Sequence, residues 1–240
     1  MPDCFEILNK DLAGRIGRLR TPHGVVETPA LMPVVNPHLR LIEPADLRKM
    51  GAEILITNSY IINQDPELKE PAAKDGVHKL LGFDGAIMTD SGAFQLSVYG
   101  DIEVQPLEIL EFQRSIGSDI CVPLDIPTPP DVSRSRAESE LAETERRLYE
   151  AREFWEDGPL LAGPIQGSTY PDLRFGAARR VREMGFDLCP IGAVVPLMEA
   201  YRFSDLVDVV SASKKGLGPA APVHLFGAGH PMMFALAAAL

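Results

Sequence analysis

Short apolar runs alternate with helical or polar stretches along the whole chain, and this alternation restricts the fold more than any other feature. The runs occupy residues 30–35, 53–56, 86–88, 119–124, 160–165, 187–191 and 222–226. Apolar runs of this length are typical of strands that are buried on both faces. Because the intervening stretches are long enough for helices, the pattern predicts βαβ units and a parallel sheet.

Helical segments are expected at residues 43–50, 133–155, 171–185 and 231–240. Pro44 and Gly51 mark the ends of the first segment, and Pro171 and Gly185 mark the ends of the third. Residues 65–78 are rich in proline and charge, so a loop is expected there.

Residues 133–155 carry the strongest helical pattern. Ser135 and Glu138 have the spacing of a capping box. One face of this helix would hold the apolar residues Leu141, Leu148, Ala151 and Trp155. We expect this face to pack against the sheet.

Residues 1–29 are expected to form an N-terminal β-hairpin, with extended segments at 5–8 and 17–20 and turns near 11–14 and 22–24. The remaining chain predicts an α/β fold, a (β/α)₈ TIM barrel that stops after its seventh unit. We treat residues 1–240 as one incomplete barrel domain. Since an open barrel has two unpaired edges, we expect a further polypeptide segment to supply the eighth strand, or a homodimer mate to complete the structure.

Composition narrows the functional classes. The 240 residues are 45% hydrophobic, which can build a sizeable core, and no apolar run is long enough for a membrane span. The N-terminus lacks the pattern of a signal peptide. Three separated cysteines favour a reducing, cytoplasmic location and form no zinc motif. The net charge of −11 means that a nucleic-acid partner would require local basic patches.

Polar residues follow the apolar runs at the points where ligands bind in parallel α/β proteins. They are Asn58 and Ser59, Asp90 and Ser91, Asp125, Gln166, and the backbone of Gly192 and Ala193. Asp90 lies beside Gly92, which allows close backbone approach to a ligand. The alternative is that Asp90 or Ser91 only caps the following helix.

This set fits a purine such as guanine. Asp125 can accept both donors of the Watson–Crick edge, while Gln166 or a backbone N–H near Gly192 donates to the neighbouring oxygen. Phe94 could stack on the ring, with core packing as its alternative. The five histidines are scattered in sequence, and no metal site is expected among these residues.

Four ordered motifs give a resemblance to a known family. They are TDSGAFQ at residues 89–95, IQG at 165–167, PIGAVVPL at 190–197 and HLFGAGHP at 224–231. Together they resemble the tRNA-guanine transglycosylases over nearly the whole chain. Phe94 and the GAVVPL stretch favour the archaeal type, the archaeosine tRNA-ribosyltransferases.

The resemblance implies a glycosyltransferase (a pentosyltransferase) that exchanges guanine at position 15 of tRNA for 7-cyano-7-deazaguanine (preQ0) on the way to archaeosine. Asp90 matches the family's acid–base residue. The substrate-binding positions would be Ser91, Phe94, Asp125, Gln166, Gly192, Ala193 and Val194. The family's nucleophilic aspartate on strand eight and its zinc site have no counterpart in this sequence. We therefore expect zinc only in the complete enzyme, and we expect this chain to be inactive alone.

Two other readings remain open. A non-catalytic barrel subunit or RNA-docking partner would have no need of Asp90, Asp125 and Gln166 together. An unrelated barrel enzyme would usually show a strand-end lysine or a phosphate-binding glycine loop. Arginine clusters at 134/136, 146/147 and 179/180/182 could contact phosphate, but ordinary solvated helix faces are the better interpretation.

Overall fold

The structure, a computed structural model, describes residues 4–93 and 105–240. Within these ranges seven parallel strands follow one another in chain order. They are β4 (Val34–Val35), β5 (Ile54–Asn58), β6 (Ala86–Asp90), β7 (Ile120–Cys121), β8 (Leu160–Leu161), β9 (Cys189–Ile191) and β10 (Val223–Leu225). Each coincides with a predicted apolar run, so the strand prediction is confirmed.

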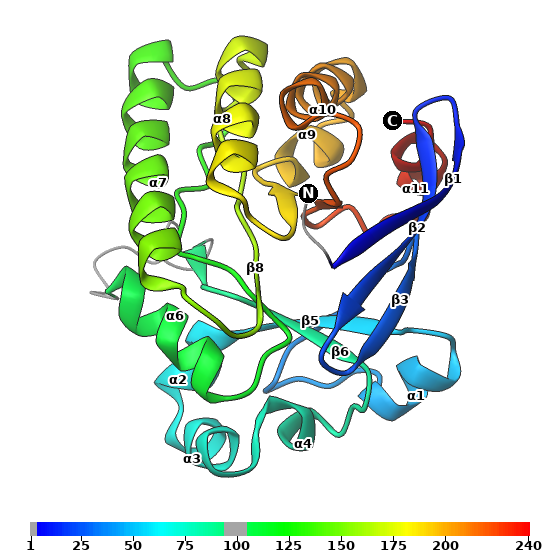
Figure 1. Cartoon of the computed structure of the whole chain (residues 1–240), viewed down its shortest axis with the longest axis vertical. Coiled ribbons are helices and arrows are strands. Elements are labelled where there is room, and N and C mark those ends of the chain that lie inside the picture. The colour runs from blue at the N-terminus through cyan, green and yellow to red at the C-terminus, as the bar shows by residue number, and fades with distance from the viewer. Residues whose placement is uncertain (1–3, 94–104) are drawn as a thin grey trace.

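Neighbouring strands pair in the order of the chain. Strands β4 to β8 form one sheet, β9 pairs with β10, and two parallel bridges, Ala162 to Leu188 and Ile165 to Ile191, connect the two groups. Among the described strands, β4 pairs only with β5 and β10 only with β9. The result is a partial (β/α)₈ barrel, as the sequence predicted (Figure 1).

Helices connect the strands. They are α1 (Pro44–Lys49), α2 (Ser59–Gln64), α3 (Pro66–Asp75), α4 (Val77–Leu81), α6 (Pro106–Ser115), α7 (Arg134–Phe154), α8 (Pro171–Met184), α9 (Val195–Glu199), α10 (Phe203–Leu217) and α11 (Pro231–Ala239). The expected loop at 65–78 was wrong, because α3 and the start of α4 lie there. Pro66 occupies the first turn of α3, where its missing N–H costs nothing, and the side chain of Asp65 accepts a hydrogen bond from the N–H of Glu67. No helix of the described residues is both long and apolar enough to cross a membrane.

The N-cap of α7 lies two residues before Ser135, the serine of the expected capping box. Ser133 is the N-cap and accepts a hydrogen bond from the N–H of Arg136. Glu138 instead pairs with Arg134 on the helix surface. The expected apolar stripe does face the core, since Leu141, Leu148, Ala151 and Trp155 are all buried.

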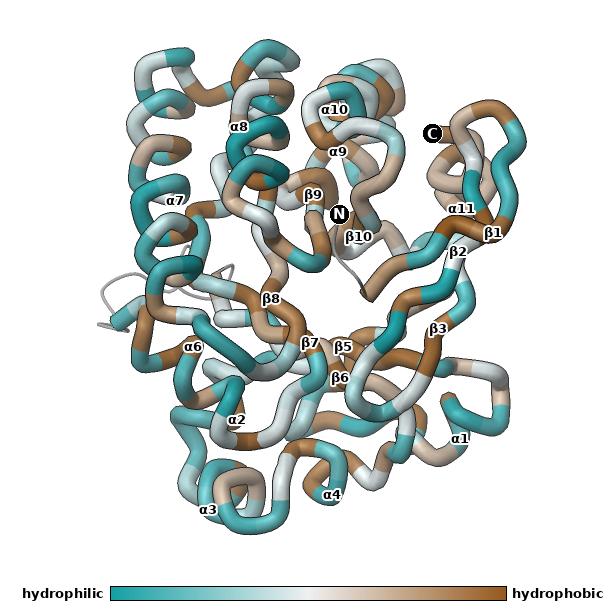
Figure 2. Tube along the Cα trace, in the orientation of Figure 1, coloured by the Kyte–Doolittle hydropathy of each residue, from teal (hydrophilic) through white to brown (hydrophobic). Residues whose placement is uncertain are grey.

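Strand side chains alternate between the barrel interior and the helical layer, as the period of two requires. The inner cluster contains Ile54, Ile56, Ala86, Met88, Ile120, Val122, Ala162 and Leu188. The residues between them, such as Leu55, Ile87 and Cys121, pack outward against the helices. In Figure 2 the strands β5, β6 and β7 are largely hydrophobic, whereas α7 and α8 mix hydrophobic and hydrophilic residues along their length.

The N-terminal residues form three antiparallel strands and not the expected two-stranded hairpin. Strands β1 (Phe5–Asp11), β2 (Gly14–Thr21) and β3 (Gly24–Thr28) pair in that order. Leu19 and Val26 from this sheet belong to the inner cluster of the barrel. The N–H of Glu27 also donates to Glu53 just before β5. The sheet therefore covers the end of the barrel at which the strands begin.

Candidate active site

Asp90 lies at the carboxyl end of β6 and is held by two donors. The amide Nδ2 of Asn58 donates to Asp90 Oδ1 at 2.7 Å, and the N–H of Gly92 donates to the same oxygen at 2.8 Å. Asn58 points this way because its Oδ1 caps α2 by accepting the N–H of Ile61. The neighbouring strand and its helix thus fix the orientation of the Asp90 carboxyl group.

The surroundings raise the pKa of Asp90 to about 7. Burial of the carboxyl group is the main cause, the hydrogen bond from Gly92 opposes it, and the negative charge of Asp125 adds to it. A carboxyl group with this pKa is present in both forms at neutral pH, so it can give and take a proton.

The turn after Asp90 requires glycine. Gly92 has φ +79°, and a Cβ there would lie 2.4 Å from the Cβ of Tyr60. Ser91 is buried, and its hydroxyl donates to the carbonyl of Pro123 at 3.4 Å. The structure therefore places the Ser91 side chain against the loop after β7. Phe94 lies outside the described residues, so its expected stacking role stays a prediction.

Asp125 and Gln166 meet at the carboxyl ends of β7 and β8. Both are buried, and Gln166 Nε2 donates to Asp125 Oδ2 at 2.6 Å. The other amide atom, Gln166 Oε1, is buried and has no hydrogen-bond partner among the residues that the structure describes. Burial raises the pKa of Asp125, while the hydrogen bond from Gln166 and the charges of Arg147 and Arg174 oppose the rise. The Asp125–Gln166 pair thus keeps hydrogen-bonding capacity in a buried position.

The loop after β9 packs directly against this pair. A Cβ on Gly192 would lie 2.2 Å from Gln166 Nε2, so only glycine leaves room for the amide. The N–H of Gly192 already donates to the carbonyl of Ile165. Ala193 is half-buried with φ +57°, and the Val194 side chain is fully buried in the main core. Of the three expected binding residues, Gly192 lies against the Gln166 amide, whereas the Val194 side chain is buried in the main core.

Sequence reasoning missed Arg174 on α8, which is fully buried behind the site. Its guanidinium donates to the carbonyls of Ser168 and Ile165, each at 2.8 Å. A signal was present in the sequence, because position 174 falls on the same helical stripe as the buried Ala177, Ala178 and Val181. A cation in an apolar stripe is a reason to look for a buried polar partner.

At the opposite end of the barrel, His23, His78 and Asp119 form a second polar cluster, although the three residues are far apart in the sequence. Their possible ligand atoms lie within 4.8 Å of one another. The two imidazole rings stack 3.6 Å apart at 24°. Both rings hydrogen-bond to the Asp119 carboxylate, at 2.8 Å from His23 Nδ1 and 2.9 Å from His78 Nε2.

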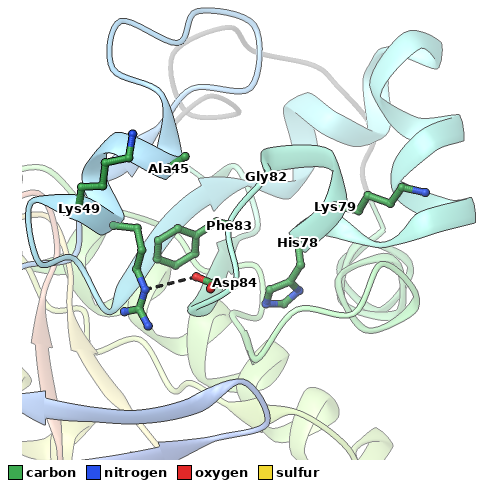
Figure 3. A pocket seen from close by; sticks show the side chains of 8 residues that line it. Ala45, Lys49, His78, Lys79, Gly82, Phe83 and Asp84 are labelled. Carbon is green, nitrogen blue, oxygen red and sulfur yellow. Dashed lines mark ion pairs between the residues drawn. The ribbon is translucent and has the colours of Figure 1, made fainter.

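An open cavity of about 650 Å³ adjoins this cluster and is lined by Ala45, Arg48, Lys49, His78, Lys79, Gly82, Phe83 and Asp84. Figure 3 shows its charged side chains, with Asp84 paired to the unlabelled arginine, Arg48. Lys49 and Lys79 are paired to Asp46 and Asp75. The cavity is at the start of β5 and β6, away from Asp90.

The arginines on the surfaces of α7 and α8 are also paired with carboxylates. Arg134, Arg136, Arg146, Arg147, Arg179 and Arg180 each form an ion pair with a carboxylate of α7 or α8. This supports the interpretation that these clusters are ordinary solvated helix faces and not a phosphate-binding patch.

Comparisons with known proteins give relatives along the whole chain. The protein from Methanosarcina barkeri is 67% identical over 240 residues, covering 100% of this chain and 49% of its own length. Relatives from Haloarcula marismortui and Pyrococcus furiosus are 59% and 56% identical, each covering 98% of the chain and 49% and 40% of their own lengths. All three are named tRNA-guanine(15) transglycosylase. The chain spans about half the length of these relatives.

The family model described as "Queuine tRNA-ribosyltransferase" (TGT) matches residues 11–240, which include both β6 with Asp90 and the Asp125–Gln166 pair. The resemblance found in the four motifs thus extends across almost the entire sequence, and the chain belongs to the queuine tRNA-ribosyltransferase family.

Proposed function

We propose that this chain carries the base-recognition and proton-transfer residues of a tRNA-guanine(15) transglycosylase, which exchanges guanine in tRNA for preQ0 in archaeosine biosynthesis. The observation that carries the proposal is the meeting of Asp90, Asp125 and Gln166 at one end of the barrel. The names of the relatives support the choice of reaction. The target nucleotide would have to leave its stack to reach such a site.

Asp125 would recognise the base. An ionised carboxylate accepts two hydrogen bonds side by side, which matches the adjacent N1–H and N2–H donors of guanine. The second N–H of Gln166 Nε2 can donate to the guanine oxygen, since only one is needed for Asp125. Gly192 keeps the amide in this place by leaving no side chain against it.

Asp90 would move the proton. When the C1′–N9 bond of the nucleotide breaks, the departing guanine takes the bonding electrons and needs a proton, which protonated Asp90 supplies. The resulting carboxylate then accepts a proton from preQ0 as its nitrogen forms the new bond to C1′. A pKa of about 7 suits both directions of transfer near neutral pH.

The nucleophile that holds the ribose between these steps, together with a zinc site, is assigned to the segment that supplies the eighth strand. The buried cysteines do not suit a zinc site. Cys121 and Cys189 are buried, and burial raises the pKa of the Cys189 thiol to about 12 and that of Cys121 further, so neither gives a ready thiolate. His23 and His78 are hydrogen-bonded to Asp119 at the other end of the barrel, away from Asp90.

The partners follow from this arrangement. We propose tRNA, guanine and preQ0 as ligands, and a segment pairing between β4 and β10, or a homodimer mate, as the completing polypeptide. Residues 1–240 would then act as one incomplete barrel domain, with the N-terminal sheet covering one end. A tRNA substrate fits a cytoplasmic location.

A non-catalytic docking subunit is the second candidate. The raised pKa of Asp90 weighs against it, because a surface that only binds tRNA gains nothing from a carboxyl group held half-protonated.

Labelled-guanine incorporation into tRNA tests the proposal. The chain is mixed with, or joined to, the remaining half of the Methanosarcina barkeri relative, and incorporation is compared with that of residues 1–240 alone. We expect activity only in the completed protein, and Asp90→Ala there should abolish turnover. Incorporation by residues 1–240 alone would contradict the assignment of the nucleophile. An active Asp90→Ala variant would contradict the role of Asp90.

A further inference from the structure

Arg174 is the only arginine or lysine that is fully buried among the residues the structure describes. Burying a guanidinium costs several kcal/mol unless hydrogen bonds and opposite charge compensate. Burial accordingly lowers the pKa of Arg174 to about 9, and the charge of Asp125 opposes that fall. An apolar side chain at position 174 would avoid this cost, so the relevant interactions are those that only the guanidinium can make.

The guanidinium clamps the turn that carries Gln166. Its two hydrogen bonds reach the carbonyls of Ile165 and Ser168, on either side of Gln166. Between them the backbone takes positive φ values, +135° at Gly167 and +51° at Ser168. The hydrogen bonds from Arg174 satisfy two buried carbonyls of this turn. They therefore fix the backbone position from which the Gln166 side chain extends.

Among the described residues, the guanidinium of Arg174 bonds only to the two carbonyls of this turn, and its Nη2 is buried without a partner. The turn connects it to Asp125, because Gln166, between the two bonded carbonyls, donates to the Asp125 carboxylate, and the charge of Arg174 favours the ionised form of that carboxylate. The other groups that face Asp125 are Gln166 at the end of β8, Arg147 on α7 and the like-charged Asp90 at the end of β6. Arg147 is itself paired with Glu143, which leaves Arg174 as the uncompensated positive charge.

We propose that Arg174 is a positioning residue that holds the Gln166 turn and keeps Asp125 ionised without touching the base. The proposal rests on the base-binding function proposed for Asp125. Asp125 can accept two N–H donors only as a carboxylate, because protonation turns one oxygen into a donor. Loss of the Arg174 charge would therefore make base binding fail at a higher pH than in the parent.

The direct test is an NMR titration of ¹³C-labelled aspartate carboxyl groups in the 240-residue chain, with the Asp125 signal assigned from Asp125→Asn. We expect Arg174→Gln and Arg174→Met to raise the titration midpoint of Asp125 by about one pH unit. Arg180→Met is the matched control, because Arg180 lies on the same helix and pairs with Glu145. A midpoint that is unchanged in both neutral variants would overturn the proposal.

Arg174→Lys separates charge from hydrogen bonding. The lysine keeps the charge but loses the two-carbonyl clamp, so the Asp125 midpoint should stay within about 0.3 unit of the parent while guanine affinity falls. If neither neutral variant folds, Arg174→Lys serves as the test. A shift of a full unit in the Asp125 titration midpoint, with the positive charge retained, would overturn the electrostatic role of Arg174.

Guanine binding, measured by calorimetry against pH in the completed protein, distinguishes this inference from the proposed function. In Arg174→Gln, the loss of guanine affinity at acidic pH should begin at a higher pH than in the parent. This shift should be absent when Arg174→Gln is combined with Asp125→Asn. If Asp125 titrates as expected but guanine does not bind the parent, the proposed function fails and the positioning role stands. If guanine binds with the same pH profile in parent and variant, the positioning role fails.

Discussion

Asp119, which is fully buried, and Asp90, which is half-buried, lie at opposite ends of neighbouring strands, and their pKa values are shifted in opposite directions. Asp119 precedes β7 and receives four hydrogen bonds, from the N–H groups of His23 and Ile87 and from the His23 and His78 rings. Burial alone would raise its pKa, but these donors outweigh burial and its pKa is lowered. Asp90 ends β6 with two donors on one oxygen, and its pKa rises to about 7.

The difference shows that burial alone does not decide the direction in which the pKa of a carboxyl group shifts. Hydrogen-bond donors to the ionised form and neighbouring charges, such as that of Asp125 beside Asp90, also contribute. At the end of the barrel where the strands begin, Asp119 accepts four hydrogen bonds. Two of them come from His23, so Asp119 connects the N-terminal sheet to the barrel. At the end where the strands finish, the two donors that the described residues give Asp90 do not offset burial, and its pKa lies close to neutral pH. This agrees with the division of barrel enzymes into a stabilising end and a reactive end.

The comparison between Asp90 and Asp119 is tested most strongly by removing the Asp90 carboxyl group alone. In the completed protein, Asp90→Asn should lower single-turnover incorporation of labelled guanine about 10²–10⁴-fold, because the proton donor is lost. Its melting temperature should not fall, since an amide can keep the bonds to Asn58 and Gly92 after a rotation. A variant that loses both activity and stability would mean that Asp90, too, is structural.

The reciprocal change should affect folding. Asp119→Ala leaves the N–H groups of Ile87 and His23 and two imidazoles without their acceptor, so we expect it to lower the free energy of unfolding by about 3–5 kcal/mol. Urea denaturation measures this. Asp84→Ala is the control, because its side chain is exposed and pairs only at the surface with Arg48, and it should change stability by less than about 0.5 kcal/mol.

A third variant tests the neighbour of Asp90. Asp125→Asn presents an N–H where guanine needs an acceptor, and it should weaken guanine and preQ0 binding by about 1–3 kcal/mol in calorimetry on the completed protein. Asp131→Asn, at an exposed residue that pairs with Arg202, should leave affinity unchanged. Equal affinity of the Asp125 variant and the parent would refute base recognition by Asp125.

The smallest expected effect concerns how the free energy of unfolding changes with pH, because Asp119 and Asp90 contribute to it with opposite signs. The folded pKa of Asp119 is lowered, so its contribution to stability is present above the ordinary aspartate pKa and is lost as pH falls through the folded value. The folded pKa of Asp90 is about 7, so its contribution is full below pH about 4 and is lost as pH rises through 7. Asp125, also raised, acts with the same sign as Asp90.

Urea midpoints at several pH values between 4.5 and 7.5 measure this slope. Asp90→Asn should become less sensitive to rising pH than the parent, by at most about 1.4 kcal/mol per pH unit. An unchanged slope would mean that Asp90 titrates in the folded protein as it does in the unfolded chain.

The sequence predicted the parallel strands because each buried strand must be apolar on both faces, which leaves a continuous run such as residues 119–124. It also predicted the strand-end positions of Asp90, Asp125 and Gln166. The third N-terminal strand was missed because Val25 and Val26 form too short a run. Helix α3 was missed because Pro66 and Pro71 suggest a loop, although Pro66 starts the helix and few side chains of α3 are buried.

Other features could not be read from the sequence for a physical reason. His23, His78 and Asp119 are 41 to 96 residues apart, and only the packing of the N-terminal sheet and α4 at the start of β7 brings them together. The hydrogen bond between Gln166 and Asp125 spans 41 residues. Local patterns give the position of a residue along a strand, whereas its partners depend on how strands and loops are packed.

The N-terminal sheet also sets an order of events during synthesis. Its residues are made first, yet its contacts lie far along the chain: His23 with Asp119, Arg15 with the carbonyl of Pro219, and Lys214 with the carbonyl of Ala13. Closing such large loops costs entropy before any contact is gained. The first thirty residues therefore gain these contacts only after about two hundred more residues have been made, and until then Leu19 and Val26 lack the barrel strands against which they pack.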